Sequence, residues 1–289
     1  PEIAVLLAYA KITLKEALLA SNLPDSEDVC ELLETYFPAA LLEPCRDVLS
    51  AHPLKRDIIA TQLVNRLVNR MGTTFVMQLG DETGASPAQV AGAWYAASSV
   101  LDAEALWREI ESLDLILDAA RQMALMAGLR AMTSAATALV LRQYLGGATI
   151  GQLLADYHPA VVEAMGRIGG GKSGAQQVTA LIGERTAIVA AFELVNLARA
   201  CDYPLNQVAL ALADLEAQID LDWLGTAVNH LPSGNRWQAR ARAQLATELV
   251  ALRQSLVRQI LQGSLPTTAA ARAVLDELKS NEPQDLAML

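Results

Sequence analysis

Aromatic side chains are scarce in this chain. Only 4% of its 289 residues are Phe, Trp or Tyr although 53% are hydrophobic, so Ala, Leu and Val supply most of the apolar material. Sheets favour aromatic and β-branched residues. Sustained alternation of apolar and polar residues, the pattern of a half-buried strand, is also missing. Both shortages favour a core of packed helices.

Cysteine and positive charge are in short supply as well. Cys30, Cys45 and Cys201 are far apart and fit neither a disulfide framework nor a zinc-binding spacing, so we expect a reducing, cytoplasmic location. The 22 Lys and Arg residues are outnumbered by 32 Asp and Glu, which gives a net charge of −10. Because phosphate binding needs clustered positive charge, and no segment provides it, we expect no nucleic-acid partner.

One apolar segment, residues 123–141, has the length of a membrane span but carries Arg130 near its centre. A charge at that depth is costly, so we predict a buried core helix and no membrane partner. The chain begins at Pro1-Glu2, without an initiator Met or a leader sequence. We therefore expect further polypeptide upstream.

Apolar residues recur at spacings of three and four throughout, as in the series Val64, Val68, Met71 and Phe75. Clusters of Pro, Gly and Asn, including His158-Pro159, divide the chain into about a dozen predicted helices. The predicted fold class is an all-α multi-helix bundle.

A shift of 118 positions relates two parts of the chain. It places Gln89, Val90, Ala91 and Ala93 on Gln207, Val208, Ala209 and Ala211. In each part a medium helix precedes a short one and then a long one, near 118–144 and 237–261. Ala-rich helices can resemble each other by chance, but the shared order favours two copies of one helical unit.

A glycine-rich segment, residues 166–173, fits the phosphate-binding pattern GxxxxGK[ST], and Gly169, Gly171 and Gly174 also fit GxGxxG. Both motifs work only when a strand precedes the glycines and a helix follows them. Residues 161–165 are predicted to be helical instead. We interpret the segment as a connection between helices with an exposed Lys172.

His52, His158 and His230 each lack a second ligand three or four residues away, so turn or capping roles are expected. No Ser lies in a nucleophile elbow and no Cys has a paired base. The acidic clusters at 25–28 and 102–104 lie at predicted helix starts, where carboxylates complement the helix dipole. No catalytic, cofactor-binding or metal-ligating residue is predicted in this chain.

Several segments resemble the large bacterial NAD-dependent glutamate dehydrogenases. The sequence PEIAVLLAYAK at 1–11, Tyr36-Phe37-Pro38, the stretch from Ile58 to Phe75 and DETGA at 81–85 carry the resemblance most specifically. Segments 190–197, 221–224 and 236–239 are also similar, whereas the glycine-rich loop departs from the family.

The resemblance implies a parent enzyme that deaminates L-glutamate to 2-oxoglutarate with NAD as cofactor, in a cytoplasmic homo-oligomer. In that family the matching segments follow the catalytic domain, whose motifs have no counterpart here. We therefore expect no cofactor in this chain, no activity of the fragment alone, and a structural or regulatory role in contact with the catalytic domain of the same polypeptide. The alternative is an independent all-helical interaction or scaffold module.

These inferences divide the chain into five predicted segments. They are N-terminal helices continuing from the catalytic domain at 1–57, repeat unit 1 at 58–145, connecting helices with the glycine-rich loop at 146–175, repeat unit 2 at 176–262, and a C-terminal helix and tail at 263–289.

A polar strip formed by Asn65, Arg66, Asn69 and Arg70 is the candidate interdomain docking site. The two arginines are four residues apart, and no carboxylate lies three or four positions from either one. One interpretation is an ion pair within the domain, with Asp81 or Glu82 as partners. The other is docking onto the catalytic domain, which predicts exposed guanidinium groups without acidic partners in this chain.

Overall fold

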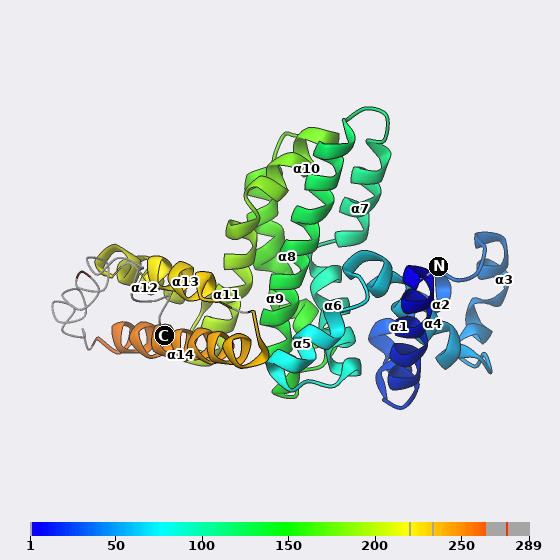
Figure 1. Ribbon diagram of the computed structural model, residues 1–289, viewed down its shortest axis with the longest axis horizontal. Helices are drawn as coiled ribbons and strands as arrows, with labels where there is room; N and C mark the ends of the chain where they lie inside the picture. Colours follow the sequence, from blue (N-terminus) through cyan, green and yellow to red (C-terminus); the bar gives the residue numbers. More distant parts are fainter. Residues whose placement is uncertain (1, 220, 233, 264–275, 277–289) are drawn as a thin grey trace. The chain divides into compact units, whose positions relative to one another are not determined.

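The computed structural model describes residues 2–219, 221–232, 234–263 and 276 (Figure 1). Every regular element within these residues is a helix, which confirms the all-α prediction. Two short 3-10 helices, η1 (Leu23–Asp25) and η2 (Glu27–Val29), lie between α1 and α2. The α-helices are α1 (Glu2–Leu19), α2 (Glu31–Glu34), α3 (Ala39–Leu49), α4 (Lys55–Met71), α5 (Phe75–Thr83), α6 (Pro87–Val100), α7 (Ala103–Ser112), α8 (Ala119–Leu145), α9 (Ile150–Gly169), α10 (Gly174–Gly183), α11 (Arg185–Cys201), α12 (Leu205–Gln218), α13 (Leu221–His230) and α14 (Arg236–Leu261).

The predicted helix end at His158-Pro159 was wrong. Helix α9 continues through Pro159, which removes one backbone donor and crowds the preceding turn. Tyr157, Ala160 and Val161 on both sides of the proline are buried. Burial of this continuous apolar face stabilises the helix against the local preference of proline.

The chain forms two compact units that divide inside α11, between residues 193 and 194. The predicted segments do not coincide with this division. The first unit contains residues 1–175 together with α10 and the beginning of α11, which were predicted to belong to repeat unit 2. The segment bounds themselves remain a prediction.

Helix α6 is the centre of the first unit. It packs against α1, α4, α5, α7, α8 and α9, and every residue from Val90 to Val100 except Ser99 is buried. Small side chains at most of these positions let the neighbouring helices approach closely.

Helix α8 is long and apolar enough to cross a membrane by length and composition, the one such helix in the described part of the chain. Leu129, Met132, Ala136 and Val140 are buried at helical spacing, and α8 packs against α6, α7, α9 and α10. From Leu129 onward α8 is therefore a core helix of the first unit, as predicted, whereas residues 123–128 include no buried residue and Met123 is 69% exposed.

The second unit has its own core. Helices α12 and α13 both pack against the long helix α14. The buried residues of this core are Leu197, Cys201, Val208, Ala211, Leu215, Ile219, Leu221 and Val257.

The two units share a three-helix arrangement. Helices α6 and α12 begin 118 positions apart, at 87 and 205, and so do α7 and α13, at 103 and 221. In both cases the first and second helices pack against a long third helix, α8 or α14. The order and lengths predicted from the internal similarity are confirmed, while the superposition of 58–145 on 176–262 remains a prediction.

Candidate functional site

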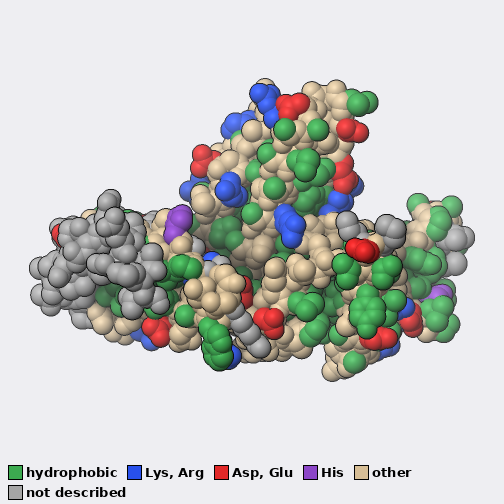
Figure 2. All heavy atoms as spheres, in the orientation of Figure 1, with side chains coloured by type: hydrophobic (Ala, Val, Ile, Leu, Met, Phe, Trp, Pro, Cys, Tyr) green, Lys and Arg blue, Asp and Glu red, His purple; other side chains and the backbone are tan. Residues whose placement is uncertain are grey.

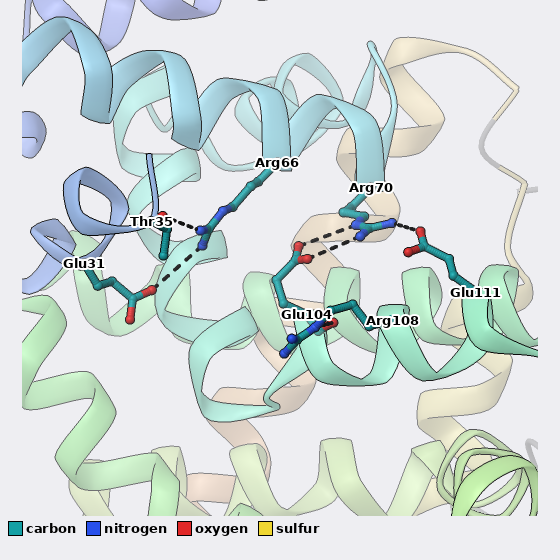
Figure 3. Close-up of polar contacts among 7 residues, drawn as sticks. All are labelled: Glu31, Thr35, Arg66, Arg70, Glu104, Arg108 and Glu111. Carbon is teal, nitrogen blue, oxygen red and sulfur yellow. Dashed lines mark hydrogen bonds and ion pairs between the residues drawn. The ribbon is translucent and has the colours of Figure 1, made fainter. Parts of the chain in front are cut away.

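Arg70 forms ion pairs that join α4 to α7 (Figure 3). Its Nε and Nη2 atoms donate to the two carboxylate oxygens of Glu104 at 3.5 and 3.3 Å, and its Nη1 atom donates to Glu111. The guanidinium carbon also lies 5.1 Å from the ring centroid of Trp107. Burial by itself lowers the pKa of Arg70, but hydrogen bonds and charges from Glu111 and Glu104 outweigh it and raise the pKa. The group remains a cation that holds two helices together.

Arg66 lies one turn earlier on α4 and contacts a different helix, α2 (Figure 3). Its Nη2 atom donates to the Thr35 hydroxyl at 2.9 Å, and its Nη1 atom is 3.8 Å from a carboxylate oxygen of Glu31. The side chain of Arg66 is 26% exposed, so this pair is partly screened by solvent.

The interpretation of Arg66 and Arg70 as ion-paired within their own domain is confirmed, but the named partners were wrong. The carboxylates come from Glu31, Glu104 and Glu111 rather than from Asp81 or Glu82. The expectation of exposed, unpaired guanidinium groups was also wrong. A docking role for the strip with Asn65 and Asn69 remains a prediction that these contacts do not support.

A small cavity of about 190 Å³ lies beside Arg66, bounded by α2, α4, α6 and the start of α7. Burial raises the pKa of Tyr95, and the charge and hydrogen bond of Glu31 raise it further, so this phenol stays neutral far above neutral pH. Asp102, at the entrance to α7, has a left-handed backbone with φ of 46°. The lining residues are Glu31, Arg66, Trp94, Tyr95, Ser98, Ser99, Asp102 and Glu104.

Two of these lining residues carry buried polar atoms without a hydrogen-bond partner in the described part of the chain. They are Nε1 of Trp94 and Oγ of Ser98, one helical turn apart on α6. Buried polar groups are nearly always satisfied in folded proteins. Neither residue was identified from the sequence.

A second, more open cavity of about 530 Å³ lies near the first turns of α6 and α9. Both helices begin with a capping box, Ser86 with Gln89 and Thr149 with Gln152. The first backbone N–H groups of both helices therefore already donate to side chains. Few free N–H groups remain there to bind an anion.

The glycine-rich loop follows a helix, as predicted, and not a strand. Helix α9 runs to Gly169 and α10 starts at Gly174. The Lys172 ammonium group donates to the Ile168 carbonyl at 2.6 Å, so it satisfies the end of the preceding helix. This geometry differs from that of a phosphate-binding loop.

The histidines have local roles. The Nδ1 atom of His52 accepts a hydrogen bond from the Leu54 amide at 3.1 Å, and the His230 ring is bonded to the Thr226 carbonyl at 2.7 Å. His158 is exposed in the interior of α9, so the expected turn or capping role was wrong for this residue. No group of three or more His, Cys, Asp or Glu residues able to hold a metal ion occurs within the described residues.

The fold and the site together define an all-helical protein with two related three-helix arrangements, ion pairs that join helices, and a small polar cavity. Comparison with known proteins places it more narrowly. The family described as "Glutamate dehydrogenase, C-terminal" matches residues 1–177 and again residues 172–289, and the chain belongs to this family. The two matches fit the presence of two related copies.

The curated relatives are much longer than this chain. The "NAD-specific glutamate dehydrogenase" of Halomonas elongata is 31% identical over 90% of the chain, and that of Pseudomonas aeruginosa is 31% identical over 99%. The Mycobacterium tuberculosis protein of the same name is 24% identical over the whole chain. The matched regions make up 17–20% of these relatives.

Proposed function

We propose that this chain is the C-terminal helical part of an NAD-specific glutamate dehydrogenase, whose catalytic domain lies elsewhere in the same polypeptide. The parent reaction converts L-glutamate, NAD and water into 2-oxoglutarate, ammonium and NADH. The observation that carries the proposal is the match of the family to the whole chain, combined with relatives that are more than five times as long. The parent enzyme is a cytoplasmic homo-oligomer in this proposal.

The role of the chain in that polypeptide is structural, and its docking surface is the first part of α1. Val5, Tyr9 and Ile12 are spaced by four and three residues and lie on one face of the helix, with Leu6 beside them. Their exposed fractions are between 57% and 72%. Figure 2 shows hydrophobic side chains gathered over this helix. Exposed apolar faces of this kind mark contacts with other domains or subunits.

The rest of α1 is anchored differently, which defines where the docking surface ends. Leu14 and Leu18 are buried, and α1 packs against α4 and α6. One helix therefore has its second half in the core of the first unit and an apolar face on its first half. We infer that the catalytic part of the same polypeptide covers that face.

The test is a double substitution, Leu6→Ser with Tyr9→Ser, in the full-length polypeptide. We expect glutamate-dependent NAD reduction or oligomer assembly to fall at least about tenfold, because two apolar contacts are lost at the centre of the surface. The melting temperature of the 289-residue chain alone should change little, since both side chains are exposed there. The matched control is Leu210→Ser, on α12, whose side chain is 69% exposed. Unchanged activity and assembly in the double variant would rule out docking through α1.

The second candidate is an independent helical interaction module. The same apolar face on α1 would then bind a separate protein. The upstream coding sequence distinguishes the two, because the first proposal requires a dehydrogenase domain in the same reading frame.

A further inference from the structure

One face of α14 is exposed where the equivalent face of α8 is buried. Four residues define the face on each helix, and spacings of three and four place them on one side. On α8 they are buried, and on α14, 118 positions later, they are exposed. They are Leu129, Thr133, Thr137 and Val140 on α8, and Thr247, Ala251, Ser255 and Arg258 on α14. We call the four residues of α14 the open face.

The first unit has additional helices around α8. This helix packs against α4, α9 and α10 as well as α6 and α7, and α9 also packs against α6 (Figure 1). Shifted by 118 positions, α4 falls on α10 and the start of α11, which belong to the first unit, and α10 falls beyond residue 289. Helix α9 falls on residues 268–287. Within this chain, the equivalent of a covering helix is therefore the segment after α14.

The sequence after α14 repeats the buried pattern of α9. Thr267 corresponds to Thr149, the N-cap of α9. Three buried residues of α9 also have apolar equivalents. They are Leu153, Tyr157 and Ala160, which correspond to Ala271, Leu275 and Leu278. The correspondence ends at Lys279, at the position of the buried Val161, and Pro283 follows soon after. The pattern predicts a helix at 267–280 with one apolar face.

Two structural observations agree with this correspondence. Residues 264–275 and 277–289 lie outside the described residues, but Asp276 is helical and exposed, as is His158 at the equivalent position of α9. The chain also leaves the two long helices in the same way. Gly147 and Gly263 are each the second residue after their helix and have φ of 94° and 73°, a conformation in which the chain can reverse direction.

Opposite charges favour contact between α14 and the segment that follows it. Helix α14 contains five Arg residues and one Glu. Residues 264–289 contain four Asp or Glu residues and two Arg or Lys. The basic helix therefore attracts the acidic segment, whereas the α14 helices of two copies of the chain would repel each other.

We propose that residues 267–280 form a helix that covers the open face of α14 and packs against α12, in the place that α9 has in the first unit. Ala271, Leu275 and Leu278 face the core of the second unit. The connection from α14, residues 262–266, is short enough to keep the two helices antiparallel neighbours. The cover comes from the same chain, and the proposal does not depend on the proposed function.

Hydrogen exchange measured by mass spectrometry on the full 289-residue chain tests the contact. Leu275→Asp places a charge on the apolar face of the segment. It should raise the exchange rates of α14 amides between residues 247 and 258 at least about tenfold, because α14 loses its cover. The matched control is Ala273→Asp, which adds the same charge on the opposite side of the segment. The equivalent residue of α9, Ala155, is exposed, so this change should leave the rates unaltered.

Two further measurements exclude other causes. Leu275→Met keeps the apolar volume and should keep the protection of α14. Exchange in α6 to α9 should be the same in all variants, which excludes general unfolding. An intrachain contact should also survive about hundredfold dilution, whereas a cover supplied by a second copy should not. Unchanged rates in Leu275→Asp, equal acceleration by Ala273→Asp or Leu275→Met, or protection lost on dilution would each overturn the proposal.

Discussion

The helices α6, α7 and α8 of the first unit and α12, α13 and α14 of the second have the same order but different surroundings. Helix α6 is enclosed by six other helices, whereas α12 leaves Leu210 69% exposed. At the position equivalent to Leu210, 118 residues earlier, the first unit has Gly92. A shared helix arrangement thus fixes which faces pack together, while the additional neighbours decide which side chains fit on the remaining faces.

The cavity shows the same contrast. The positions equivalent to Trp94, Tyr95 and Ser98 in the second unit are occupied by Leu212, Ala213 and Glu216. The two polar donors and the phenol have no counterparts there. These three side chains of the cavity lining are therefore particular to the first copy.

The largest expected effect comes from emptying the equivalent core positions. Leu101 and Ile219 are 118 positions apart and almost fully buried. Replacing either by Ala should cost about 3 kcal/mol through lost burial and a cavity. Hydrogen exchange measured by mass spectrometry should show that Leu101→Ala loosens α6 to α9, whereas Ile219→Ala loosens α12 to α14. Equal loosening of both units by either change would mean that they do not fold as separate units.

A smaller effect is expected from exchanging the residue types at Gly92 and Leu210, which occupy equivalent positions in the two copies. A Cβ atom at Gly92 would lie 2.9 Å from the Tyr144 hydroxyl, so Gly92→Leu should destabilise the chain by about 2 kcal/mol through overpacking. Leu210→Gly should cost at most about 1 kcal/mol, the usual effect of glycine within an exposed helix.

Urea unfolding midpoints measure both changes. Adding Tyr144→Ala to Gly92→Leu is the control, because it removes the clash and should restore part of the loss. If the added change restores no stability, the strain lies elsewhere on α6.

The smallest effect is a pH dependence confined to the first unit. The pKa of Tyr95 is raised above its ordinary value of 10.0 in the folded chain, mainly by burial. The stability linked to the neutral phenol is present below that ordinary value and is lost as the pH rises above it, by at most about 1.4 kcal/mol per pH unit. Tyr95→Phe should remove this loss. Urea unfolding between pH 8 and pH 11 tests it, and identical slopes for the two proteins would contradict it.

Local patterns were sufficient to predict the helices, the copy relationship and the helical approach to the glycine-rich loop. They failed at Pro159, where burial of Tyr157 and Val161 overrides a local helix breaker. They also failed to identify the partners of Arg70, since Glu104 and Glu111 lie 34 and 41 residues away along the chain. Periodicity shows which face of a helix is polar but not which other helix meets it.

The central place of α6 has a consequence for synthesis on the ribosome. Its partners α1, α4 and α5 precede it in the chain, but α8 and α9 follow it. When residues 87–100 have left the ribosome, the surfaces of α6 that α8 and α9 will cover are still without partners. Exposed apolar surface of this kind makes nascent chains prone to aggregation and to chaperone binding. A translational pause before α9 has left the ribosome would lengthen that exposure, whereas a pause after residue 193 has emerged would allow the first unit to close before the second unit follows.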